Sequence, residues 1–268
     1  MIRTELVKTL RRPRTWVTIL LLNALPTLVA VLLALTDLGP RPGSGPAFLS
    51  AVLADGTLFP LAALAIILPL FLPVAVAVVA GDSVAGEAQQ GTLRYLLVRP
   101  VSRTRLLVAK LVAVIAFVLL AVVVVAAVAY VVGSVLLGDQ ALAASVSGTV
   151  LTPAQVAVRT LLAIGYITLS MLGVAAIALL LSTMTDSPLA AALGALAFLI
   201  ASSLLLTLDA AQTLQPYLPT RYWLAFVDLF RDPIFWRDIV RGIGLQAVYV
   251  VVFLGAAWAN FTTKDITS

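Results

Sequence analysis

Residues 81–110 read GDSVAGEAQQGTLRYLLVRPVSRTRLLVAK and decide how the rest of the chain is arranged. The runs on either side, 57–80 and 111–137, contain no charged residue. Charged side chains are costly in hydrocarbon, so this polar stretch is predicted to stay in water between two membrane spans. Its charged residues are Asp82, Glu87, Arg94, Arg99, Arg103, Arg105 and Lys110.

The composition is that of an integral membrane protein. Hydrophobic residues make up 62% of the 268 residues and charged residues only 11%, whereas soluble domains are about half apolar and about a quarter charged. The sequence predicts an all-α membrane protein that forms one membrane domain. Cys and His are both absent, which excludes disulfides, thiol nucleophiles and imidazole bases.

Six apolar runs are each long enough to cross a bilayer, which needs about 20 residues. The third run would reach nearly 50 Å as a helix, at about 1.5 Å per residue, so it is expected to tilt or to project from the membrane. Pro60, Pro69 and Pro73 predict that the second run is kinked. The predicted spans are 16–36, 57–80, 106–137, 157–183, 189–208 and 242–261.

Residues 1–15 combine five basic residues with Ile2, Leu6 and Leu10, which recur every fourth position. This spacing predicts an amphipathic helix that lies on the membrane surface, with its apolar side down and its basic side toward anionic lipid head groups. The alternative is a frayed basic tail that only orients the first span.

Basic residues concentrate in 1–15 and 81–110, which predicts that both segments and both termini lie in the cytoplasm of a multi-pass cell-membrane protein. The segment 209–241 holds four Arg and four Asp and is therefore neutral. We expect it to form short external or re-entrant helices. The alternative is a cytoplasmic loop, which would require one predicted span to be wrong.

The polar stretch is predicted to fold as two short helical pieces. Asp82 or Ser83 can cap the first piece and Gly91 ends it, whereas Thr92 can cap a second piece at 93–98. Ser102 can cap the third span. A helix tied to a span at each end would act as a lever on both spans.

An acidic residue, Gly-Thr-Leu, Arg-Pro-Val-Ser-Arg, two Leu and a Lys follow one another here at the head of a span. This pattern, together with the tail 261–266 (FTTKDI), resembles the permease subunits of type-2 ATP-binding-cassette exporters. The matching residues are Glu87, Gly91, Thr92, Leu93, Arg99, Pro100, Val101, Ser102, Arg103, Leu106, Leu107 and Lys110.

The resemblance implies a membrane subunit that pairs with a second copy or a paralogue and with two separate ATPase subunits, which would bind the ATP and magnesium. The chain itself has no G-x-x-x-x-G-K-[ST] loop, so we expect no cofactor and no enzymatic activity in it. No nucleic-acid partner is expected. The residues implied to couple to the ATPase are Asp82, Glu87, Gly91, Thr92, Leu93, Arg94, Tyr95, Arg99 and Arg103.

The predicted spans contain essentially no buried ionisable group, because Lys110 and Arg159 are expected to snorkel from span ends. This absence favours an apolar or amphipathic cargo, such as a drug, lipid or peptide, and an energy source outside the chain. Intramembrane polar residues could line its pathway, although such residues also commonly bond neighbouring helices. The candidates are Asn23, Tyr166, Ser170, Ser202, Ser203 and Gln246.

Two other functions are compatible with the sequence. One is a secondary carrier driven by an ion gradient, and the other is a membrane anchor for an ATPase that moves no cargo. An intramembrane enzyme is disfavoured, because no span carries a convergent pair of carboxylates.

Overall fold

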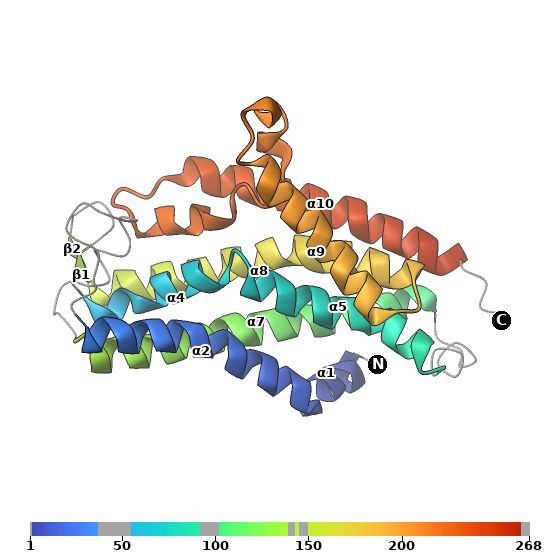
Figure 1. Ribbon diagram of the computed structural model, residues 1–268, viewed down its shortest axis with the longest axis horizontal. Helices are drawn as coiled ribbons and strands as arrows, with labels where there is room; N and C mark the ends of the chain where they lie inside the picture. Colours follow the sequence, from blue (N-terminus) through green and yellow to red (C-terminus); the bar gives the residue numbers. More distant parts are fainter. Residues whose placement is uncertain (1, 37–54, 92–101, 139–142, 145–149, 264–268) are drawn as a thin grey trace.

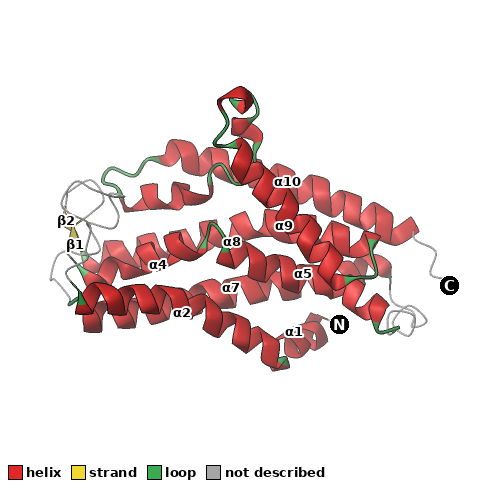
Figure 2. Ribbon diagram, in the orientation of Figure 1, coloured by secondary structure: helices red, strands yellow, loops and turns green. Residues whose placement is uncertain are grey.

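The structure is a computed structural model that describes residues 2–36, 55–91, 102–138, 143–144 and 150–263. Long helices lie side by side along one axis (Figure 1), and helix is the dominant secondary structure (Figure 2). The α-helices are α1 (Ile2–Arg11), α2 (Pro13–Leu35), α4 (Phe59–Ile67), α5 (Phe71–Gln89), α7 (Arg103–Leu136), α8 (Pro153–Met184), α9 (Pro188–Leu205) and α10 (Trp236–Thr263). The short elements are the 3₁₀ helices η1 (Gly56–Leu58), η2 (Asp209–Ala211), η3 (Gln215–Tyr217) and η4 (Trp223–Phe230), and the antiparallel pair β1 (Ala143–Ala144) and β2 (Val150–Leu151).

Six of these helices, α2, α5, α7, α8, α9 and α10, are long and apolar enough to cross a membrane. The prediction of a multi-pass, all-α membrane protein is therefore confirmed. α1 and the last turns of α10 lie toward one end of the bundle, and β1 and β2 lie at the other (Figure 1). An even number of crossings between the two termini agrees with that arrangement.

The second predicted span, 57–80, is interrupted, in agreement with the kink predicted from its prolines, but its predicted end is wrong. It is broken between α4 and α5 at residues 68–70, and its helix continues past Ala80 to Gln89. Pro69 explains the break, since proline has no backbone N–H and clashes with the carbonyl four residues earlier. Pro60 and Pro73 lie in the first turns of α4 and α5, where that N–H is not needed.

Side-chain caps fix where three of the long helices begin. The Ser102 hydroxyl accepts a hydrogen bond from the Arg105 amide at the start of α7, as predicted. Ser187 caps α9 in the same way. At the start of α8, Thr152 and Gln155 form a reciprocal capping box, followed by Pro153 in the first turn.

α8 lies at the centre of the bundle and packs against α5, α7, α9 and α10. In its most apolar window 67% of the residues are buried, compared with 17% for α10 and 22% for α2. The outward faces of α2, α9 and α10 carry exposed large apolar side chains such as Leu20, Leu204 and Val251. These faces suit contact with lipid, whereas α8 and α5 form the interior.

The end of α7 and η1 meet at three glycines, Gly56, Gly133 and Gly138. The Gly56 amide donates to the Gly138 carbonyl at 3.1 Å, and a Cβ placed on Gly133 would overlap the Gly56 carbonyl oxygen. The absence of a side chain at Gly133 therefore sets how closely the end of α7 approaches the start of the broken helix.

We expect Gly133→Ala to destabilise the bundle by about 1–3 kcal/mol, because the added methyl has no space. Gly165→Ala on α8 is the matched control, since nothing lies within 4 Å of a Cβ there. The measurement is the thermal unfolding midpoint of the purified chain in detergent. Equal midpoints for the two variants would contradict the close approach.

Candidate functional site

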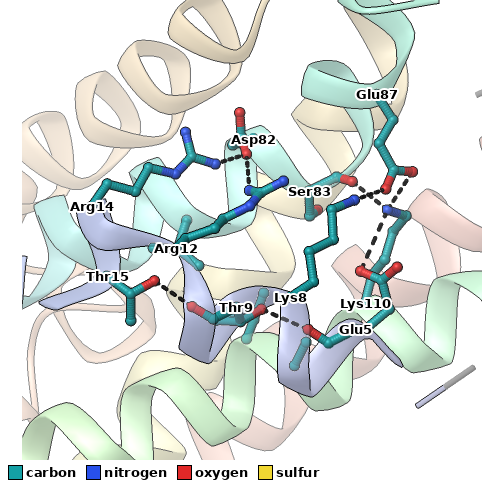
Figure 3. A pocket seen from close by; sticks show the side chains of 13 residues that line it. Glu5, Lys8, Thr9, Arg12, Arg14, Thr15, Asp82, Ser83, Glu87 and Lys110 are labelled. Carbon is teal, nitrogen blue, oxygen red and sulfur yellow. Dashed lines mark hydrogen bonds and ion pairs between the residues drawn. The ribbon is translucent and has the colours of Figure 1, made fainter. Parts of the chain in front are cut away.

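A network of ion pairs joins α1 to the last turns of α5 and the first turns of α7 (Figure 3). We call it the charged network. It lies toward the end of the bundle that holds α1 and the last turns of α10 (Figure 1). Its members are Glu5, Lys8, Arg12, Arg14, Asp82, Glu87 and Lys110.

Glu87 and Lys110 form the buried part of the charged network. The two residues are 4% and 1% exposed, and the Glu87 Oε2 lies 2.6 Å from the Lys110 Nζ. Lys8 donates to the other Glu87 oxygen at 2.7 Å, and Lys110 also donates to the Ser83 carbonyl at 2.5 Å. Glu5 lies 4.0 Å from the Lys110 Nζ. The pair therefore ties α5 to α7 and draws α1 onto both.

Asp82 forms the more exposed part of the charged network. It accepts from Arg12 at 2.8 Å and also pairs with Arg14, so both arginines at the α1–α2 junction bind one carboxylate on α5. Since Arg12 directly follows α1 and Arg14 lies in the first turn of α2, Asp82 fixes the bend between these helices.

Two predictions about these residues are wrong. Asp82 and Ser83 do not cap a separate helix, because α5 runs without interruption from Phe71 to Gln89. Lys110 does not snorkel to water, because Glu87 and the Ser83 carbonyl hold its amine inside the bundle. Both errors have the same cause, because α5 does not end with the apolar run at Ala80 but continues to Gln89.

The prediction that the basic side of residues 1–15 faces lipid head groups is wrong for three of its residues. Lys8, Arg12 and Arg14 are paired with carboxylates of α5, whereas Arg3 and Arg11 are exposed. Sequence reasoning counted the basic residues but did not find their partners. The available signal was the acidic pair Asp82 and Glu87 in an otherwise basic region.

Ser182, near the end of α8, joins α8 to α5 and was not predicted. Its hydroxyl accepts from the amides of Val84 and Ala85 at 3.1 and 2.9 Å and donates to the Gly81 carbonyl at 2.6 Å. A single hydroxyl thus bonds three backbone groups of α5 in a buried position. We expect it to couple the ends of α5 and α8, the two most buried of the six helices long enough to span a membrane.

The start of α7 is bonded to the end of α10. Arg103 donates to the carbonyls of Phe261 and Thr262, each at 3.1 Å, and the Trp258 indole donates to the Thr104 hydroxyl at 2.9 Å. Phe261 is buried in a small apolar cluster with residues of α5 and α7. Cations near a helix C-terminus also interact favourably with its carbonyls.

The remaining predicted coupling residues fall in two groups. Gly91 follows the end of α5 with a φ of +67°, a left-handed conformation that glycine adopts without strain, so its predicted role as a helix breaker is confirmed. Gln89 and Gln90 are exposed beside it. The other residues lie outside the described residues, and they are Thr92, Leu93, Arg94, Tyr95 and Arg99.

Three of the candidate cargo residues bind one short segment, 217–222. The Tyr166 hydroxyl donates to the Tyr222 carbonyl at 2.6 Å, and the Gln246 amide donates to the Pro219 carbonyl at 2.7 Å. The Ser202 hydroxyl lies 2.8 Å from that of Thr220. These side chains come from α8, α9 and α10, so they hold the segment against the bundle.

The other candidate cargo residues are placed differently. Asn23 and Ser170 bond carbonyls of their own helices, at Ile19 and Tyr166. Ser203 lines a cavity of about 260 Å³ between α5, α9 and Trp223. Arg159 is 7% exposed and binds the Arg231 carbonyl at 2.9 Å, so the prediction that it snorkels is also wrong.

The fold and the charged network together define a multi-pass helical membrane protein whose N-terminal helix is bonded to its spanning helices. The model of a protein family described as "Protein of unknown function (DUF2705)" matches residues 45–267. The match covers well over half of the chain, so the protein belongs to this family. α1 and α2 precede the matched residues. No curated protein matches the sequence.

We expect Lys110→Met and Glu87→Gln each to destabilise the chain by about 3–5 kcal/mol, because each leaves a buried charge without its main partner. The double variant is expected to recover part of that loss. The measurement is a double-mutant cycle on thermal unfolding midpoints in detergent. Arg105→Met, at an exposed position on α7, is the control and should have little effect. Additive effects of the two single variants would contradict a coupled buried pair.

Proposed function

We propose that this chain is the membrane subunit of an ATP-binding-cassette exporter of a hydrophobic or amphipathic compound. Two separate ATPase subunits supply ATP and magnesium, and a second copy or a paralogue of the chain completes the transporter. It lies in the cell membrane with both termini in the cytoplasm. The observation that carries the proposal is that the helix ends flanking residues 92–101 are bonded to α1, α8 and α10.

Those bonds suit a mechanical coupling element. A force on residues 92–101 acts on the end of α5 and the start of α7, which the buried Glu87–Lys110 pair joins. Ser182 would pass the movement to α8, and Arg103 would pass it to α10. Since packed helices with polar bonds move as units rather than deform, a lever at this point would rock several spans together.

α1 suits the role of a surface helix within this assembly. Its basic side is fixed to α5 by Lys8, whereas Ile2, Val7 and Leu10 are at least 40% exposed. An apolar side exposed on a helix that is itself tied to spanning helices is expected to rest on lipid. Movement of α5 would then be opposed or guided by the membrane surface.

The cavities support an apolar cargo. One of about 690 Å³ lies between η1, α4, α7 and α8, and its lining is mostly apolar. Thr57, Tyr130 and Thr160 are the residues with hydroxyl groups in that lining. Its size is in the range of pockets that hold drug-sized molecules.

Single-cysteine variants can test the proposal, because the natural chain contains no cysteine. We expect Gln90→Cys, exposed at the end of α5, to react with a membrane-impermeant maleimide only from the cytoplasm. It should also crosslink to an ATPase that is encoded beside the chain or copurifies with it. The measurement is mass spectrometry of labelled and crosslinked peptides.

Thr213→Cys, exposed between η2 and η3, is the matched control and should react from outside without crosslinking. Labelling of Gln90→Cys from outside, or the absence of any ATPase at that position, would overturn the proposal. An ATPase that crosslinks at Gln90→Cys but whose hydrolysis no amphiphile stimulates would identify a membrane anchor instead.

A carrier driven by an ion gradient is the second candidate, because the Glu87–Lys110 pair is a buried ionisable pair inside the helix bundle. Such pairs mark ion or proton pathways in many transporters. Liposomes that contain only this chain would distinguish the two functions. We expect no accumulation of an amphiphilic dye when a proton or sodium gradient is imposed, and accumulation under either gradient would favour the carrier.

A further inference from the structure

A second charged region lies in the segment between α9 and α10. A pocket of about 580 Å³ is lined by side chains of η4, of the residues around it and of the first turns of α10. We call it the arginine pocket. Its charged lining residues are Arg221, Asp228, Arg231, Arg237, Asp238 and Arg241.

The arginine pocket has more positive than negative charge. Arg231 pairs with Asp228 at 2.7 Å, and Arg241 lies 3.9 Å from Asp238. Arg221 and Arg237 have no acidic partner within 4 Å among residues 2–36, 55–91, 102–138, 143–144 and 150–263. Two guanidinium groups in a concave site are therefore available for an anion.

The frame of the pocket is fixed before any ligand binds. The hydrogen bonds from Tyr166, Ser202 and Gln246 hold residues 217–222, the segment that contains Arg221. On the other side, Arg159 holds the Arg231 carbonyl. A Cβ at Gly242 would overlap the Tyr166 hydroxyl, so glycine there lets α10 approach this frame. Such preorganisation lowers the cost of ordering a binding site.

The edge of the pocket is apolar. Phe235 lines it beneath Arg231, whose guanidinium carbon lies 5.6 Å from the ring centroid. Phe235 and the adjacent Trp236 are 58% and 52% exposed, as is typical of aromatic residues at a membrane–water interface. Val240 and Ile243 extend the exposed apolar surface along α10. A ligand with an anionic head and an apolar tail would match both parts.

The start of α10 lies nearer the end of the bundle with β1 and β2 than the end with α1 (Figure 1). The arginine pocket is thus separated along the bundle from the charged network. Charged residues inside or next to a bilayer are tolerated where they line a water-filled cavity. At the membrane–water interface, water can reach the arginines of the pocket.

We propose that the arginine pocket binds the phosphate of an anionic lipid head group, with the acyl chains along the apolar face of α10. Arginine suits this ligand, since its planar guanidinium binds phosphate oxygens through two hydrogen bonds at once. The inference deepens the proposed exporter function, on which it rests, by naming the cargo or the regulating lipid as a phosphate-bearing amphiphile.

The test measures binding of a fluorescent phosphatidylglycerol to the full purified chain in detergent, with no ATPase present. Arg221→Gln with Arg237→Gln is expected to weaken binding at least about tenfold, because two charge-assisted contacts are lost. Arg221→Lys with Arg237→Lys should keep part of the affinity. Arg105→Gln removes a positive charge at an exposed position near the start of α7, far from the arginine pocket, and should leave binding unchanged.

Competition by unlabelled lipids identifies the ligand. Phosphatidylglycerol should displace the probe at far lower concentration than phosphatidylcholine, glycerol phosphate or inorganic phosphate. Equal loss of binding in the Arg105→Gln control, or equal competition by phosphatidylcholine or by inorganic phosphate, would overturn the proposal. Because this assay contains no ATPase, its failure is separate from failure of the crosslinking experiment at Gln90.

Discussion

The ion pair between Glu87 and Lys110 is the contact on which the arrangement of the α1 end depends. Neither charge could be buried alone, since removing an ionised group from water costs several kcal/mol unless a partner compensates it. Together they allow α5 to continue past its apolar run and pack on α7. Lys8 donates a hydrogen bond to the other oxygen of the Glu87 carboxylate, so the N-terminal helix is held by the same group.

Polar side chains elsewhere in the bundle have a comparable structural use. Ser182 bonds the backbone of α5, whereas Tyr166 and Gln246 bond the backbone of the 217–222 segment. In hydrocarbon, backbone groups that leave a regular helix need such partners. The polar residues of the spans therefore explain how an irregular segment is kept in a membrane bundle and how α8 is joined to α5.

The sequence predicted those features of the fold that follow from local chemistry. The spans came from the lengths of apolar runs, the start of α7 came from Ser102, and the end of α5 came from Gly91. Pro69 marked the break in the second span, although only the structure showed that Pro60 and Pro73 lie in first turns. These signals act within one turn of helix, so a single sequence contains them.

The partners across the bundle could not be read in the same way. Charge counting placed Lys8 and Glu87 on one side of the membrane, but their pairing depends on how α1 turns back over α5. Tyr166, Ser202 and Gln246 looked like separate polar residues of three spans, because nothing periodic in 209–241 shows where its backbone passes. Which side chains pair across the bundle is decided by packing. In the sequence, such pairs are visible only as polar residues whose partners are not evident.

The two charged regions differ in how their charges are balanced, and this difference separates their roles. In the charged network each basic residue lies against a carboxylate, and the central Glu87–Lys110 pair is almost fully buried, which suits a structural contact between helices. In the arginine pocket the arginines exceed the aspartates and line an open concavity. Excess positive charge in the arginine pocket is unfavourable in the free protein, and an anionic ligand removes that cost. The cations of the charged network are already paired with carboxylates, so only the arginine pocket is left able to bind an anion.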